Sequence, residues 1–113
     1  MGIGIDIVFI PRFVRVLEYT PAVLDQILHP NEMESNVDIT FVAGRFAAKE
    51  AILKCGLAWL NILKFNQIDI GRIEGSKSKF LLNGMQYIVD ISISHDCEYV
   101  VAVASNLQAI RDK

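Results

Sequence analysis

The N-terminal residues alternate strictly between two kinds of side chain. One side carries the apolar residues Ile3, Ile5, Ile7 and Phe9, and the other carries Gly2, Gly4, Asp6 and Val8. A period of two is typical of a β-strand, because successive side chains of a strand point to opposite faces. The pattern therefore predicts a strand over residues 2–10, ended by Pro11, which has no N–H to donate to a sheet.

The middle of the chain has the spacing and end signals of helices. Three helical segments are predicted: residues 12–28, 31–35 and 41–55, with a turn at 28–31. The first is expected to break at Thr20-Pro21, since proline suits the first turn of a new helix. The third can be capped by Asp38 or Thr40, and Gly56 is a typical residue just past a helix end.

The second half of the chain has the pattern of a sheet. Strands are predicted at residues 65–73, 80–82, 89–94 and 99–105. Asn83-Gly84 is a tight-turn sequence, and Asp96-Cys97-Glu98 is expected to join the last two strands as a hairpin. These elements predict an α+β fold in a single domain over residues 1–113, with N-terminal helices packed on a mostly antiparallel sheet.

Composition narrows the class of protein. Hydrophobic residues make up 52% of 113, a high share for so short a chain, so we expect some of them to lie in a subunit interface. The formal net charge of −2 provides no strong field for nucleic acid or anionic lipid, and no apolar run is long enough to span a bilayer. We expect a cytoplasmic protein that binds neither nucleic acid nor membrane, with Cys55 and Cys97 reduced rather than bridged.

The charged residues of the helix predicted at residues 41–55 lie between apolar stripes. Arg45 and Lys49 are one turn apart, and Glu50 and Lys54 have the spacing of a helical ion pair. An ordinary surface pair is one interpretation. The other is a functional cluster, because apolar surroundings would partly desolvate these charges, and unpaired charge in such a place is costly.

Asp6 is a carboxylate in the middle of the first predicted strand. Its side of the strand offers only Gly4 and Val8 as neighbours, so it needs a partner from elsewhere. A salt bridge to an arginine is one possibility. The other is a site for a hard cation, since Mg²⁺ is usually held by one or two carboxylates together with phosphates and waters.

Residues Ser92, Ser94, His95 and Asp96 form a third polar group. Ser94, His95 and Asp96 are adjacent in sequence and would point to alternate faces of a strand, so they cannot form a hydrolase triad. The Ser94 hydroxyl and the His95 imidazole could bind a phosphate at the sheet edge; an ordinary turn histidine is the alternative. No Walker loop and no Gly-x-Gly-x-x-Gly motif occurs.

Three stretches of the sequence fit one family in their order and spacing: GIGIDIV at residues 2–8, AGRFAAKEAILK at 43–54 and ISISHD at 91–96. Together they resemble the holo-acyl-carrier-protein synthases, the small bacterial type of 4′-phosphopantetheinyl transferase. The resemblance implies an enzyme that moves the phosphopantetheine arm of coenzyme A onto a serine of apo acyl carrier protein. It also implies adenosine 3′,5′-bisphosphate as second product, a requirement for Mg²⁺, and a homotrimer with its sites between subunits.

The resemblance also implies roles for individual residues. Asp6 and Glu50 match the metal carboxylates, and Lys54 matches a lysine near the pyrophosphate. From the chemistry of the reaction, either Glu50 or a metal-bound water is a candidate base for the serine hydroxyl. Arg45, Lys49 and His95 match residues on the coenzyme A side of the cleft, and Arg12 matches a basic residue facing the acidic carrier protein; Arg15 lies at helical spacing from Arg12 and can share its face.

Some positions depart from the family pattern. Phe9 stands where family members usually have Glu, residues 56–59 replace a Gly-Thr-Gly loop, and residues 75–79 replace a Gly-Lys-Pro turn. Two alternatives to an active transferase therefore stay open. One is a catalytically weakened relative that binds coenzyme A or carrier protein, and the other is an unrelated small α+β binding module.

Overall fold

A computed structural model describes residues 2–33, 38–56, 62–70, 77–82 and 84–110 of the chain. In chain order the elements are β1 (Gly4–Phe9), α1 (Ile10–Tyr19), α2 (Val23–Ile27), the 3₁₀ turn η1 (Pro30–Met33), α3 (Ile39–Gly56), the 3₁₀ turn η2 (Ile62–Gln67), β2 (Lys77–Leu82), β3 (Met85–Asp96) and β4 (Tyr99–Ile110). The predicted α+β architecture is confirmed, and every strand pair in the sheet is antiparallel.

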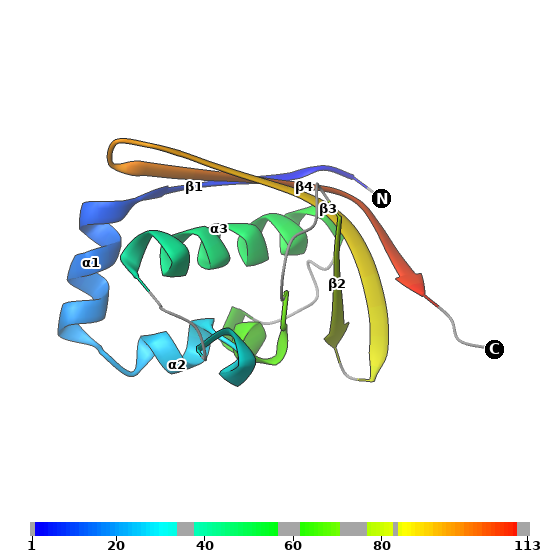
Figure 1. Cartoon of the computed structure of the whole chain (residues 1–113), viewed down its shortest axis with the longest axis horizontal. Helices are drawn as coiled ribbons and strands as arrows, with labels where there is room; N and C mark the ends of the chain where they lie inside the picture. Colours follow the sequence, from blue (N-terminus) through cyan, green and yellow to red (C-terminus); the bar gives the residue numbers. More distant parts are fainter. Residues whose placement is uncertain (1, 34–37, 57–61, 71–76, 83, 111–113) are drawn as a thin grey trace.

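The sheet has the strand order β1-β4-β3-β2, and α3 lies along one of its faces (Figure 1). On the other side of α3 lie α2 and the two 3₁₀ turns, while α1 continues from the end of β1 at one end of the molecule. The long helix is therefore enclosed between the sheet and a second layer of short helical segments, which explains why apolar residues surround its charges.

The contact between β1 and α3 is unusually close at Gly4. A Cβ atom added to Gly4 would lie only 1.8 Å from the Ala51 carbonyl oxygen. The facing side of α3 is correspondingly lined with small side chains, of which Ala47, Ala48 and Ala51 have no exposed surface. The absence of a side chain at Gly4 thus sets how near the strand approaches the helix.

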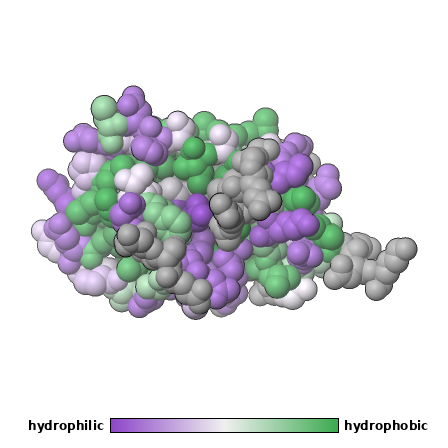
Figure 2. Space-filling view, viewed as in Figure 1, coloured by the Kyte–Doolittle hydropathy of each residue, from purple (hydrophilic) through white to green (hydrophobic). Residues whose placement is uncertain are grey.

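The first strand forms over Gly4–Phe9, shorter than the predicted 2–10, and its most apolar side is directed away from α3. Gly4 and Val8 face the helix and are buried, whereas Ile5 and Ile7 are 59% and 61% exposed. Val103 and Val101 of β4 pair with Ile5 and Ile7 and extend the same outer face. Apolar side chains gather along part of the upper edge in Figure 2, where this face is seen edge-on.

Two helices begin earlier than predicted, at Ile10 rather than residue 12 and at Ile39 rather than residue 41. Pro11 therefore lies in the first turn of α1, a position that suits proline. The first helical region breaks at Thr20-Pro21 between α1 and α2, and η1 covers part of the predicted segment 31–35, whose last two residues lie outside the described part. Of the two candidate caps, Asp38 is the one that bonds to the helix, since its Oδ1 atom accepts a hydrogen bond of 2.8 Å from the Phe41 backbone N–H. The helix ends at Gly56 as predicted.

The prediction of a strand at residues 65–73 is wrong. Residues 62–67 form η2, residues 68–70 have no regular structure, and 71–73 lie outside the described residues. The apolar side chains there are buried, but side chains satisfy the backbone: Lys49 Nζ donates to the Phe65 carbonyl and Ser78 Oγ to the Ile70 carbonyl. Those two side-chain hydrogen bonds take the place of backbone hydrogen bonds that a strand would form with a neighbouring strand.

The remaining strands are longer than predicted, because the sheet continues past a bulge at Ile88/Asp90. Gly84, with φ of +79°, turns the chain between β2 and β3, and Asn83 lies outside the described residues. Cys97, with φ of +51°, lies in the predicted hairpin between β3 and β4. Cys97 and Cys55 are both free, as expected. No helix among the described residues is long and apolar enough to cross a membrane.

Candidate active site

Two adjacent elements bring Asp6, Glu50 and Lys54 together. Lys54 Nζ on α3 donates hydrogen bonds to Asp6 Oδ1 (3.0 Å) and to the Ile5 carbonyl oxygen (3.1 Å), both on β1. Asp6 points toward the helix because it lies on the same side of the strand as Gly4 and Val8. The partner that the sequence left open for Asp6 is therefore Lys54, which was predicted as a site residue but not as this contact.

Glu50 lies one helical turn before Lys54 and is electrostatically coupled to both of its neighbours. Burial raises the pKa of the Glu50 carboxyl, repulsion from Asp6 raises it further, and the Lys54 ammonium partly offsets these effects. Two carboxylates and one ammonium leave this group with a formal charge of −1. Such a group suits either proton acceptance or a cation.

The donor set of the pair fits a hard divalent cation. Asp6 and Glu50 supply carboxylate oxygens, the atoms that Mg²⁺ prefers. The described residues contain no group of three or more His, Cys, Asp or Glu that could hold a metal by itself. A cation here would therefore complete its coordination with water and with oxygens of a phosphate-bearing substrate.

Lys49 lies away from this group and is completely buried. Its Nζ atom donates to Glu32 Oε1 (2.6 Å) and to the carbonyl oxygens of Ile27 (2.7 Å) and Phe65 (3.0 Å). All three ammonium hydrogens are thus used. The expectation that Lys49 lines a coenzyme A cleft is not met in this fold, where it ties α2, η1 and η2 to α3.

Glu32 is the structurally important residue that sequence reasoning missed. It is buried, and its second carboxylate oxygen lies 3.4 Å from Arg45 Nε. The signal was present in the sequence: two cations on an apolar-faced helix require an acid nearby, and Glu32 was available in the short polar segment before the helix.

Arg45 lies at the margin of the buried cluster. Its guanidinium is 4.6 Å from the centre of the Phe41 ring, and its side chain is 14% exposed. Burial lowers the Arg45 pKa, and the charges of Glu32 and Asp69 partly restore it. Arg45 is therefore held in position by its neighbours, with one edge near solvent.

The polar residues of β3 divide between the two faces of the sheet. Ser94 pairs with Val101 and lies on the outer face, whereas His95 pairs with Val100 and lies on the helix side, near the hairpin. Both are exposed. A single copy of the chain therefore does not bring the Ser94 hydroxyl together with Asp6, Glu50 and Lys54.

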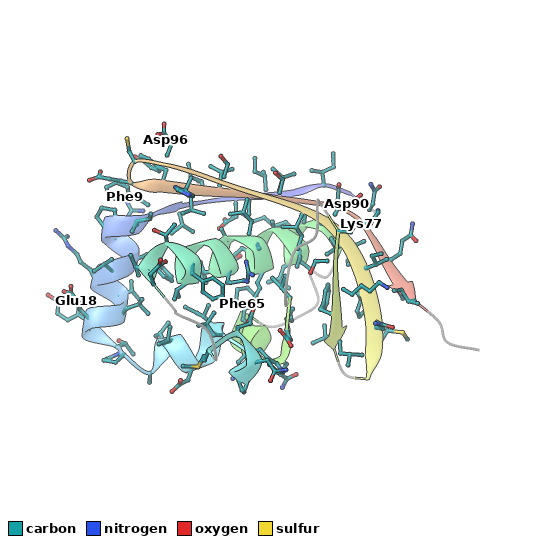
Figure 3. The ribbon with its side chains drawn as sticks, viewed as in Figure 1. Phe9, Glu18, Phe65, Lys77, Asp90 and Asp96 are labelled. Carbon is teal, nitrogen blue, oxygen red and sulfur yellow. The ribbon has the colours of Figure 1, made fainter. Side chains whose placement is uncertain are left out.

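The two predicted docking arginines lie on the exposed side of α1. Arg12 is 5.7 Å from the centre of the Phe9 ring, and Figure 3 shows Phe9 where β1 passes into α1. Arg12 also borders an apolar cavity of about 320 Å³, whose lining includes Phe46 on α3, one turn before Glu50. Arg15 borders a separate cavity of about 500 Å³ beside the hairpin.

Comparison with known proteins gives consistent matches over nearly the whole chain. Residues 2–104 match the 4′-phosphopantetheinyl transferase superfamily. The holo-[acyl-carrier-protein] synthase of Anoxybacillus flavithermus is 39% identical over 109 residues, which cover 90% of this chain and 91% of the relative.

Solved structures share the fold as well. The holo-[acyl-carrier-protein] synthase of Helicobacter pylori in complex with coenzyme A superposes with a TM-score of 0.73 and 29% identity, over 91% of this chain and 97% of the other. The enzyme of Bacillus anthracis in complex with CoA (3′,5′-ADP) has a TM-score of 0.67 and 32% identity, over 96% and 95%.

Proposed function

The chain belongs to the 4′-phosphopantetheinyl transferase superfamily, and from this membership we propose that residues 1–113 form one transferase domain that modifies apo acyl carrier protein. The 4′-phosphopantetheine group of coenzyme A moves to a serine hydroxyl, and adenosine 3′,5′-bisphosphate leaves. The main observation in support of the proposal is that Asp6, Glu50 and Lys54 lie close together between β1 and α3, in a chain similar to synthases whose structures were solved with coenzyme A.

The chemistry asks the protein for positioning and for charge compensation. The serine oxygen forms a bond to the phosphorus that bears pantetheine, and the bond from that phosphorus to the bridging diphosphate oxygen breaks. Glu50, whose pKa is raised by burial, accepts the serine proton, and the Lys54 ammonium stabilises the charge on the departing phosphate.

We also propose that Asp6 and Glu50 hold Mg²⁺. When bound there, the ion neutralises diphosphate charge, as divalent cations do in phosphoryl transfer generally. The carboxylate oxygens of Asp6 and Glu50 suit the ion, and Asp6 lies on the side of β1 that faces the helix carrying Glu50.

Substrate binding is proposed to involve more than one copy of the chain. Arg45 and His95 bind coenzyme A phosphates, and Ser94, on the opposite sheet face from His95, contacts substrate across a subunit boundary. A homotrimer packed through the outer apolar face of β1 and β4 supplies that boundary. Exposure of Ile5 and Ile7 supports it, because burying such surface stabilises assembly by about 25 cal/mol per Å².

The partner is proposed to dock on α1 in the cytoplasm. Arg12 and Arg15 are exposed on a helix of a slightly acidic protein, so they offer a local positive surface to an acidic carrier protein. Such rim charges act mainly on the rate of encounter. Reversing Arg12 to Glu should therefore raise the KM for carrier protein and leave the KM for coenzyme A nearly unchanged.

Intact-mass spectrometry of apo carrier protein tests the main proposal. After incubation with this protein, coenzyme A and Mg²⁺, the carrier protein should gain one phosphopantetheine group, and the Asp6→Ala and Glu50→Ala proteins should give none while remaining folded. If wild-type protein gives no adduct yet still binds coenzyme A, the alternative of a weakened binding module is correct instead. Normal transfer by Asp6→Ala would end the metal assignment.

A further inference from the structure

The Lys54 ammonium forms an ion pair with Asp6, one of the two carboxylates that a cation would need. Its Nζ atom contacts Asp6 Oδ1 at 3.0 Å and is held there by a second bond, of 3.1 Å, to the Ile5 carbonyl oxygen. Lys54 is also one turn from Glu50, so its ammonium compensates both acids of the proposed metal pair. A divalent cation approaching Asp6 and Glu50 therefore meets a positive charge already in place.

Another lysine of the same helix provides a contrast. Lys49 has no exposed surface, and three acceptors use all the hydrogens of its ammonium. The Lys54 side chain is 52% exposed, so its ammonium can exchange Asp6 for another anion by rotation of a long, flexible stem. Lys49 therefore serves to hold the short helical segments on α3, whereas Lys54 can exchange one counter-ion for another.

We propose that Lys54 is a displaceable counter-ion that makes binding of the divalent cation depend on the diphosphate substrate. Without substrate, Lys54 stays on Asp6 and weakens cation binding. When a diphosphate arrives, the ammonium moves to its oxygens and frees the Asp6 carboxylate. This inference rests on the proposed function, because it takes coenzyme A as the source of the diphosphate.

The consequence is positive cooperativity between cation and coenzyme A. If coenzyme A frees Asp6 and so strengthens cation binding, the cation must strengthen coenzyme A binding by the same factor, since linkage is reciprocal. Removing the lysine charge should remove the part of this coupling that Lys54 provides. The variant would then bind the cation more tightly by itself and gain from coenzyme A only what the diphosphate oxygens add as ligands.

Binding of Mn²⁺, followed by the loss of its free electron paramagnetic resonance signal, measures this directly without turnover. We expect coenzyme A to tighten Mn²⁺ binding to the wild-type protein by about tenfold or more, the size of effect that one screened unit charge at a few ångströms produces. Lys54→Met should bind Mn²⁺ about tenfold more tightly than wild type when no coenzyme A is present. Lys54→Gln serves as the second variant if Lys54→Met does not fold.

Lys77→Met is the matched control. Lys77 Nζ also contacts an aspartate oxygen at 3.0 Å, on Asp90, and both side chains lie together on β2 and β3 away from α3 (Figure 3). This variant removes a lysine–aspartate pair of the same length and should bind Mn²⁺ like wild type, with and without coenzyme A.

Two results would overturn the inference: equal Mn²⁺ affinities of wild type and the Lys54 variants without coenzyme A, or a wild-type affinity that coenzyme A leaves unchanged. The intact-mass assay on the same wild-type sample distinguishes failure of the counter-ion role from failure of the proposed function. Transfer without coupling refutes the counter-ion role alone, whereas absence of transfer refutes the proposed function.

Discussion

An alanine at position 4 should push β1 away from α3 and separate Asp6 from its partners on the helix. The added Cβ atom would lie 1.8 Å from the Ala51 carbonyl oxygen, 2.7 Å from the Ala51 carbonyl carbon and 2.8 Å from the Cys55 backbone nitrogen. All three are backbone atoms of α3, so no side-chain rotation can relieve the overlap. The strand or the helix has to move.

The size of that movement follows from the contact. Moving the closest contact from 1.8 Å to 3.0 Å, the lower limit for real Cβ contacts, requires about 1.2 Å. Overpacking of this kind costs about 1–3 kcal/mol of folding free energy. A displacement near 1 Å at a reacting centre lowers the rate by about 100-fold, so transfer activity should fall by roughly that factor.

Gly2→Ala is a matched control two residues before Gly4, just ahead of β1 and also beside α3. Its added Cβ atom would meet the Cys55 carbonyl oxygen at 3.8 Å, an ordinary contact. Urea unfolding measures the stability of both variants, and intact-mass assays of carrier protein measure their activity. If Gly4→Ala matched Gly2→Ala in both measurements, the close approach of β1 to α3 would have no role in building the site.

Three further predictions concern other parts of the molecule. Glu32→Gln should lower the free energy of unfolding by about 3–5 kcal/mol in urea titrations, because it leaves the buried Lys49 without its anion; unchanged stability would contradict the buried ion pair. In metal-free buffer at neutral pH, Glu50→Gln should be more stable than wild type, since the raised pKa means that ionised Glu50 opposes folding. This difference in stability should disappear as the pH falls below the ordinary pKa of a glutamate carboxyl, where wild-type Glu50 is protonated in both the folded and the unfolded protein. A difference that grows in acid would refute the prediction. If the proposed trimer packs through Ile5 and Ile7, Ile7→Asp should reduce the mass measured by light scattering from that of three copies to that of one copy of the 12.7 kDa chain, with the secondary structure retained by circular dichroism; an unchanged mass would place the interface elsewhere.

The sequence predicted those parts of the fold that local chemistry decides. Alternation in the first strand, a cap at Asp38 or Thr40, the Gly56 end and the Cys97 hairpin all depend on a few neighbouring residues, and of the two candidate caps the structure uses Asp38. The false strand at residues 65–73 shows where local information stops. Phe65, Ile68 and Ile70 are buried, but side chains from other segments satisfy the backbone there, and a pattern of hydrophobicity carries no record of such partners.

The candidate site also has features that the sequence could predict and features that it could not. Asp6, Glu50 and Lys54 could be selected because each charge stood among apolar or small neighbours, and the family resemblance grouped them. The sequence could not show that the glycine side of β1 faces the helix, since alternation defines two faces without saying which is covered. It also could not separate Lys49 from Lys54, because only the packing of the short helical segments buries one and leaves the other half exposed.

The pairing of β1 with β4 bears on when the site can assemble during synthesis. The register joins Gly4 to Ala104 and Phe9 to Tyr99, so the paired residues are separated by 90 to 100 positions along the chain. Domains are made from the N-terminus onward, and contacts between distant residues form slowly because a long loop must close first. A growing chain on the ribosome therefore contains Glu50 and Lys54 long before Asp6 has a sheet to hold it, and the site can assemble only after the last strand has been made.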